Sequence, residues 1–450
     1  MRERLRGMRR LTRQQFLLMS AGAGAGFVLA GCGGGGPQNN PAVQGQGGSG
    51  SGGTEYTGPT VELAFWNGFT GGDGPFMREL VDQFSSEHEN IQVSMSTQEW
   101  EDYYESVPAA VRGGSGPDVG IMHSDQLGTN AARGVILPLD SVAESLGLEE
   151  SDFAPEVWNA GIYNGQRFGI PLDMHPLALY YNKTLLEQAG LDPNSPPQTR
   201  DDYEAALEEL KSSGIQGSWV SPFPFTGTLQ FESLLWQFGG DLYNEDVTRA
   251  TFNSDAGVEA LTWMVDLVQN DYSPSDVAQD AEFIAFQNGE NALHWNGIWQ
   301  LNALKEVEDL DLGVAPLPQI GSENATWSGS HNFVIMQTSD QDRIDASQVF
   351  INWISQQSIE WARAGQIPAR ASVRESQEFA DLQEQSTIAE QVPYVRFVPA
   401  VPGIGDVQPE SFDQAVNEAV LLQNDPKTAL DEAAQRADQI LEENREKYEA

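Results

Sequence analysis

Cysteine, lysine and long apolar runs are all scarce in this chain of 450 residues. Its one cysteine, Cys32, excludes a disulfide scaffold and a thiolate metal cluster. Five of the 24 basic residues are lysines, and 66 acidic residues give a formal net charge of −42. Such a surface repels phosphates, so we expect no nucleic-acid partner. Because salt screens this self-repulsion, we expect a halophilic protein, with an ordinary acidic secreted protein as the alternative.

No stretch reaches 18 consecutive apolar residues, but the N-terminus has the parts of an export signal. Arginines crowd positions 2–13, and the apolar run 16–29 is too short to span a bilayer as a helix. The sequence Leu29-Ala30-Gly31-Cys32 resembles a lipoprotein lipobox. This resemblance implies a signal peptide over 1–32 and a membrane anchor on a lipidated Cys32. A near-match to a twin-arginine motif at 12–17 leaves Tat and Sec export both open.

Residues 33–57 are rich in Gly, Ser, Gln and Asn and show no apolar periodicity. Such a composition behaves as a flexible coil. We therefore expect a linker that holds a globular part away from the membrane.

From Val61 onward the pattern alternates between strand and helix. Strands are predicted at 61–66, 91–95 and 118–122, with amphipathic helices between them at 76–84 and 103–111. Later helices are expected at 201–212, 256–270 and 346–356 and over the last 40 residues. This order predicts open α/β sheets with ligands at the carboxyl ends of the strands. No break in composition follows residue 58, so a second domain must arise from chain crossings.

Several short motifs follow one another in a characteristic order. They are Gly116-Pro117-Asp118-Val119, Ile170-Pro171-Leu172 with Leu179-Tyr180-Tyr181-Asn182-Lys183, the block Phe286–Trp299, and Val349–Ile354 with Gly365–Arg370. Each motif is weak alone, but together they resemble the extracellular solute-binding proteins of ABC importers. The resemblance is to the sugar-binding group, which includes the maltose- and multiple-sugar-binding proteins.

That resemblance implies a two-lobed periplasmic-binding-protein-like fold with a hinge and more than one chain crossing. Lobe 1 would comprise 58–172 plus 331–372, and lobe 2 would comprise 177–327 plus 376–450. A solute would lie in the cleft, and the lobes would close over it. The implied function is capture of a mono- or oligosaccharide and its delivery to the transmembrane subunits of an ABC permease. We expect a monomer with no cofactor.

Five residues are predicted to bind the ligand, because sugar sites pair flat aromatics with carboxylates and amides. Trp66 and Asn67 end the first strand and Asp125 follows the third. His175 and Trp299 stand where relatives contact the sugar. Weaker candidates are Trp295, Trp327, Phe223 and Phe225. Each tryptophan could instead belong to the core. Asp118 is expected to form a hydrogen bond with the backbone. The pair Tyr180-Tyr181 is expected to pack within a strand rather than to bind iron.

The remaining constellations do not indicate an enzyme. The Gly48–Gly52 match to G-x-S-x-G lies in the linker, and the five histidines show no metal-ligand spacing. Chance carboxylate pairs keep a secreted glycoside hydrolase or a lectin open as an alternative. The second alternative is an ABC receptor for a non-sugar solute, such as a polyamine.

Overall fold

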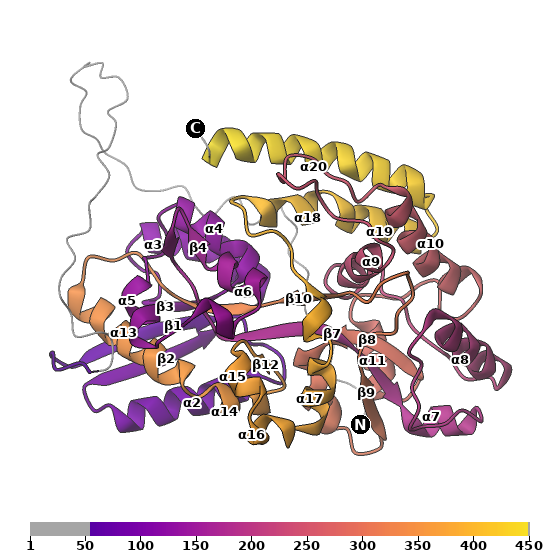
Figure 1. Ribbon diagram of the computed structural model, residues 1–450, viewed down its shortest axis with the longest axis horizontal. Coiled ribbons are helices and arrows are strands. Elements are labelled where there is room, and N and C mark those ends of the chain that lie inside the picture. The colour runs from indigo at the N-terminus through magenta and orange to yellow at the C-terminus, as the bar shows by residue number, and fades with distance from the viewer. Residues whose placement is uncertain (1–54, 449–450) are drawn as a thin grey trace, which may run out of the picture. The chain divides into compact units, whose positions relative to one another are not determined.

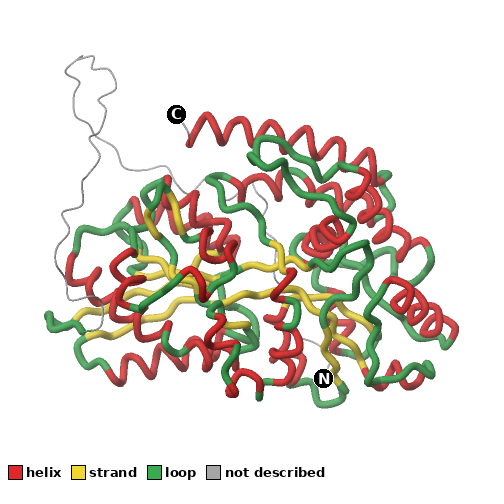
Figure 2. Tube along the Cα trace, viewed as in Figure 1, coloured by secondary structure: helices red, strands yellow, loops and turns green. Residues whose placement is uncertain are grey.

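A computed structural model describes residues 55–448 of the chain. The predicted signal peptide, Cys32 and nearly all of the linker lie outside the described residues. The strands form two main sheets with helices on their faces and a separate two-stranded sheet (Figures 1 and 2). The prediction of sheets flanked by helices is confirmed.

The first sheet has five strands in the order β2-β1-β3-β11-β6. Their bounds are β1 (Val61–Asn67), β2 (Ile91–Thr97), β3 (Val119–His123), β6 (Ile170–Pro171) and β11 (His331–Ile335). β1 lies parallel to β2 and β3, whereas β11 runs antiparallel to both β3 and β6. β11 comes from a distant part of the chain and enters the sheet between β3 and β6.

Buried residues alternate with more exposed ones along β1, and the buried side chains pack against the helices that cover this sheet. Leu63 and Phe65 are fully buried and pack against Phe84 and Phe350. Those side chains come from α2 (Gly74–Glu87) and α13 (Gln341–Ser355). Another apolar cluster contains Tyr103, Met122 and Val334, the first of them from α3 (Trp100–Arg112). Further helices here are α4 (Ser124–Ala132), α5 (Asp140–Ser145), α6 (Pro155–Ala160) and α14 (Ser358–Arg363).

The second sheet is built around one long strand, β7 (Asp173–Asn182), all ten residues of which are buried. Its partners are β8 (Leu293–Gly297), β9 (Leu312–Ala315), β10 (Thr326–Gly329) and β12 (Ile367–Pro368), and β13 (Val395–Arg396) extends β10. The hydroxyl of Tyr180 donates to the Gly297 carbonyl at 2.9 Å. The prediction that the tyrosine pair packs within a strand is thus confirmed for this residue.

Helices around the second sheet include the three that were expected near 201–212, 256–270 and the C-terminus. Their bounds are α7 (Lys183–Gln188), α8 (Arg200–Ser212), α9 (Thr226–Gln237), α10 (Asp255–Gln269), α11 (Ala281–Gln287), α12 (Leu301–Lys305), α15 (Ala371–Arg374), α16 (Gln377–Ala380), α17 (Gln383–Ala389), α18 (Val407–Glu410), α19 (Phe412–Val420) and α20 (Pro426–Tyr448). The small strands β4 (Ile162–Tyr163) and β5 (Gln166–Arg167) pair with each other. α20, yellow in Figure 1, packs with α18 and α19.

The chain crosses between the two sheets three times, the third time between Ile335 of β11 and Ile367 of β12, and the first two crossings lie side by side. It leaves the first sheet between Pro171 and Asp173 and returns between Gly329 and His331. These two crossings are bonded together, because the Leu172 amide donates to the His331 carbonyl at 2.8 Å. This confirms a fold with more than one crossing, whereas the lobe boundaries given above stay a prediction.

No helix among residues 55–448 combines the length and the apolar character that a bilayer span requires.

Candidate ligand-binding site

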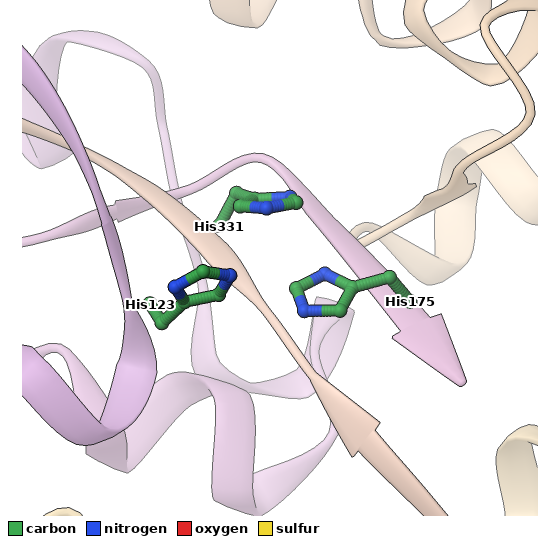
Figure 3. Close-up of side chains that lie close together, drawn as sticks. All are labelled: His123, His175 and His331. Carbon is green, nitrogen blue, oxygen red and sulfur yellow. The ribbon is translucent and has the colours of Figure 1, made fainter. Parts of the chain in front are cut away.

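Three histidine rings meet where the two sheets are joined (Figure 3). His123 ends β3, and its direct partner in the sheet register is His331, the first residue of β11. His175, from β7, pairs across with Gly329, two residues before His331. A Cβ on Gly329 would lie 2.1 Å from Nε2 of His175, so only glycine leaves space for this ring. Backbone register therefore fixes the cluster.

A buried carboxylate, Asp173, orients two of these rings. Its Oδ1 accepts a hydrogen bond from Nδ1 of His175 at 3.1 Å, and its Oδ2 accepts one from Nδ1 of His331 at 2.8 Å. Asp173 also accepts the His331 amide at 3.0 Å and Nε1 of Trp361 at 2.7 Å. Because each donor is buried, this one carboxylate holds both crossing strands in place.

The electrostatics of this cluster follow from its burial. Burial alone would raise the pKa of Asp173, but the attraction and hydrogen bonds of His331 and His175 outweigh it, and the pKa lies below its usual value. Burial and the neighbouring His331 lower the pKa of His175 to about 4 and lower that of His123 well below its usual range. Both rings are therefore neutral at pH 7.

A second buried acid, Asp73, lies close enough to His331 and Asp173 for their charges to shift its pKa. Burial raises the pKa of Asp73 to about 6, although His331 pulls it down. Nε2 of Gln366 donates to Oδ2 of Asp73 at 3.0 Å, and Oδ1 has no hydrogen-bond partner.

Aromatic side chains surround the histidines on both sides. The Trp299 and Trp327 ring centroids lie 6.0 and 5.7 Å from that of His175, and the two indoles stand perpendicular to each other at 6.3 Å. On the other side, Trp100 stacks on His331 at 5.5 Å and lies 4.4 Å from His123. The Trp100 ring also lies against Gly68, where a Cβ would meet it at 2.1 Å.

The predicted site residues are brought together in part. His175 and the half-buried Trp299 are neighbours in the cluster. Asn67 is fully buried; its Oδ1 accepts the Phe69 amide at 3.2 Å, and the Phe69 ring lies 4.9 Å from His331. Trp66 packs on the apolar cluster that also supports Trp100 and Tyr104, so it borders this region. Whether these residues bind a ligand stays a prediction.

Asp125, the fifth predicted residue, stands in the first turn of α4 near two other acids. Nε2 of Gln126 donates to its carboxylate at 2.9 Å, yet burial raises its pKa. Burial and the negative charges of Asp413 and Asp125 raise the pKa of Glu232 well above its usual value. Glu232 is fully buried on α9, and both of its carboxyl oxygens lack a hydrogen-bond partner.

The weaker candidates for ligand binding lie in different environments. Trp327 joins the cluster beside His175, whereas Trp295 is buried in the core and stacks on Trp263 at 5.8 Å. Phe225 is 59% exposed. Asp118 accepts the Ala64 amide at 2.8 Å, so its predicted bond to backbone is confirmed.

Sequence reasoning missed His123, His331, Asp173, Tyr104 and Glu232. One usable signal was present: Asp173 and His175 are two apart in a strand and therefore share a face. The other positions gave no such signal, since 158 residues separate Asp173 from His331.

A cavity of about 640 Å³ lies elsewhere, and none of the five predicted residues lines it. Its walls include Trp236, Asp241, Arg374 and the segment 392–396. The convergence of polar and aromatic side chains at the histidine cluster identifies the candidate site better than this cavity does.

Two α/β sheets joined by crossing strands, with polar and aromatic groups at the junction, form an arrangement in which small solutes can bind. Residues 79–386 match the family described as bacterial extracellular solute-binding protein. The chain belongs to this family. Because the family and its structural neighbours are binding proteins, the protein is a solute receptor and not an enzyme.

Individual relatives agree with this assignment. The sn-glycerol-3-phosphate-binding periplasmic protein of Shigella flexneri is 25% identical over 327 residues, covering 68% of this chain and 74% of the relative. The cyclic α-maltosyl-1,6-maltose binding protein of Arthrobacter globiformis is 25% identical with a TM-score of 0.73, covering 86% of this chain and all of that one. The GacH receptor of Streptomyces glaucescens, solved with acarbose, is 23% identical with a TM-score of 0.77, over 86% and 99% of the two chains. The resemblance to the sugar-binding group of ABC-importer receptors is thereby confirmed.

Proposed function

We propose that the protein is a lipid-anchored extracytoplasmic receptor that captures a carbohydrate at the junction of the two sheets and delivers it to an ABC sugar permease. The observation that carries this proposal is the perpendicular pair Trp299 and Trp327 beside His175. Sugar rings present apolar faces that stack on indoles, and their edges carry hydroxyls that need polar partners.

Unpartnered polar atoms in this region support a ligand rich in hydroxyls. Nδ2 of Asn67 and both carboxyl oxygens of Glu232, which lies near Asp125, are buried without hydrogen bonds. A buried polar atom left unpaired costs about 1–3 kcal/mol. A sugar whose hydroxyls reached these atoms would recover part of that free energy, which an apolar solute could not.

The charges near the histidines favour a sugar over the phosphorylated ligand named for the Shigella relative. Within residues 55–448, no lysine or arginine hydrogen-bonds to or stacks on the rings of His123, His175 or His331. The charged group that contacts these rings is the carboxylate of Asp173. This arrangement disfavours a phosphate, but it suits a polyamine, which is the second candidate.

The remaining parts of the proposal follow from the sequence. Lipidation at Cys32 would anchor the chain, and the linker 33–57 would give the lobes a reach of roughly 25–30 Å. Lobe 1 at 58–172 plus 331–372 and lobe 2 at 177–327 plus 376–450 would close around the solute. Ligand binding would favour the closed state, which a monomer would present to the permease.

The first test measures tryptophan fluorescence and melting temperature of the full-length protein, purified in detergent and kept in molar salt. Titrants are mono- and oligosaccharides, sn-glycerol 3-phosphate and polyamines. We expect a saturable response to one sugar. A response to polyamine or glycerol phosphate alone would keep a receptor and reject the carbohydrate.

The matched variants are Trp299→Ala and Trp353→Ala. Both indoles are half-buried, but Trp353 packs on Phe84 of α2, a helix that covers the first sheet, away from the histidines. We expect Trp299→Ala to weaken sugar binding about tenfold to a hundredfold, from about 1–3 kcal/mol of lost stacking and burial. Trp353→Ala should keep the affinity. Equal affinities of the two variants would contradict the proposed platform.

A further inference from the structure

The geometry points to a binding site for one divalent transition metal ion, formed by His123, His175 and His331. One ring nitrogen from each residue lies within 4.8 Å of the others. The ring centroids are 4.1 Å apart for His175 and His331, 4.8 Å for His123 and His331, and 5.4 Å for His123 and His175. Figure 3 shows the three rings facing a common space.

The partners behind these rings have the arrangement of a second coordination shell. Asp173 accepts a hydrogen bond from Nδ1 of both His175 and His331, which leaves the lone pair of each Nε2 available. The Tyr104 hydroxyl lies 2.7 Å from Nδ1 of His123 and can accept a hydrogen bond from it in the same way. Metal-binding histidines almost always have such a carboxylate or oxygen partner on their second nitrogen. Nε2 of His175 is buried with no hydrogen-bond partner, as expected of an unused ligand atom.

The supports of the site are rigid. His123 and His331 are paired in neighbouring strands, and His175 lies in the fully buried strand β7. A site on strands holds its ligands more accurately than a site on loops. A small inward movement of the rings would bring the three nitrogens to the ~2.0–2.1 Å distances of a zinc–histidine site.

The donor set selects the class of ion. Three imidazole nitrogens suit Zn²⁺, Cu²⁺, Ni²⁺ and Co²⁺, whereas Mg²⁺ and Ca²⁺ prefer oxygen ligands. Nearby carboxylates, Asp173 and Asp73, would offset the charge of the ion. Three protein ligands leave a fourth position open, as in zinc sites where water or substrate completes the coordination.

The location gives the ion a role in solute capture. His123 and His331 belong to the first sheet and His175 to the second, so a bound ion would tie the two sheets together. Its open position would lie near the tryptophans beside His175, within reach of an oxygen or nitrogen of the solute. This role in capture rests on the proposed function, whereas the metal site itself does not.

The test is calorimetric titration of Zn²⁺ into the full-length protein after treatment with EDTA. We expect one ion per chain, a higher melting temperature, and with Co²⁺ the intense visible absorption of four-coordinate cobalt. Failure of Zn²⁺ to bind would overturn the proposal.

Variants locate the ion and separate it from adventitious binding. The half-buried His123 is changed by His123→Gln, which should weaken Zn²⁺ binding at least a hundredfold. Tyr104→Phe removes only the outer hydroxyl and should weaken it about tenfold to a hundredfold. The control is His88→Gln, which changes a histidine that directly follows α2 and stacks on Phe84, and the Zn²⁺ affinity of this variant should equal that of the wild type. Equal Zn²⁺ affinity in all three variants would overturn the site.

The two proposals fail separately. If sugar binds in EDTA while Zn²⁺ shows no specific binding, the metal site is rejected and the receptor stands. If Zn²⁺ binds one per chain and depends on His123 while no sugar binds, the metal site stands and the carbohydrate proposal is rejected.

Discussion

Replacing Asp173 with asparagine tests the network that joins the two crossing strands. The carboxylate accepts hydrogen bonds from His175, His331 and Trp361 at 2.7–3.1 Å, all in the buried interior. Asp173→Asn keeps the shape but removes the charge and turns one acceptor into a donor that faces other donors. Breaking a buried charged network by removing one partner costs about 3–5 kcal/mol. We expect this loss in the free energy of unfolding.

The assay is urea unfolding followed by circular dichroism, with a thermal melt beside it. At ~2.1 cal/mol/K per residue over about 390 described residues, a loss of 3–5 kcal/mol lowers the melting temperature by about 4–6 °C. The matched control is Asp125→Asn, because that carboxylate has a single side-chain donor, Gln126, and burial disfavours its charge. The control should lose less than about 1 kcal/mol. A loss below about 1 kcal/mol for Asp173→Asn would refute the assigned role of the network.

Two further predictions concern charge. Burial raises the pKa of Glu232 well above its usual value and that of Asp413 to about 6, so the folded state binds their protons more tightly than the unfolded state. Stability from these groups is present at acidic pH and falls as the pH rises above about 4, through about 6 for Asp413 and through the raised pKa of Glu232. Glu232→Gln should flatten this fall and raise the free energy of unfolding at pH 8 by roughly 1–3 kcal/mol, measured in urea across the pH range. A variant with an unchanged slope would contradict that interpretation. With a net charge of −42, the melting temperature should rise as NaCl increases from about 0.1 M to about 3 M, and a flat response would argue against halophilic adaptation.

The elements of the fold could be predicted because their periodicity is local. Val61–Trp66, Ile91–Met95 and Asp118–Met122 were expected as strands, and the structure has β1, β2 and β3 there. The expected helices at 76–84 and 201–212 match α2 and α8. Burial of one face imposes a spacing on the sequence itself, so these elements need no knowledge of the tertiary fold.

The site was less predictable because long-range pairing creates it. His331 meets His123 only because β11 enters the first sheet beside β3. Glu232 stands in a helix that is buried along its whole length, where no polar face distinguishes it. His175 and Trp299 were found through the family resemblance rather than through spacing.

Hydrogen exchange with the bound sugar tests the central claim most directly, because it locates the ligand on the chain. We predict that the sugar slows amide exchange at the strand ends around the histidines, in the segments 67–73, 123–126 and 298–301. Protection confined to the walls of the 640 Å³ cavity, at 239–241 and 392–396, would contradict a binding site at the junction of the two sheets.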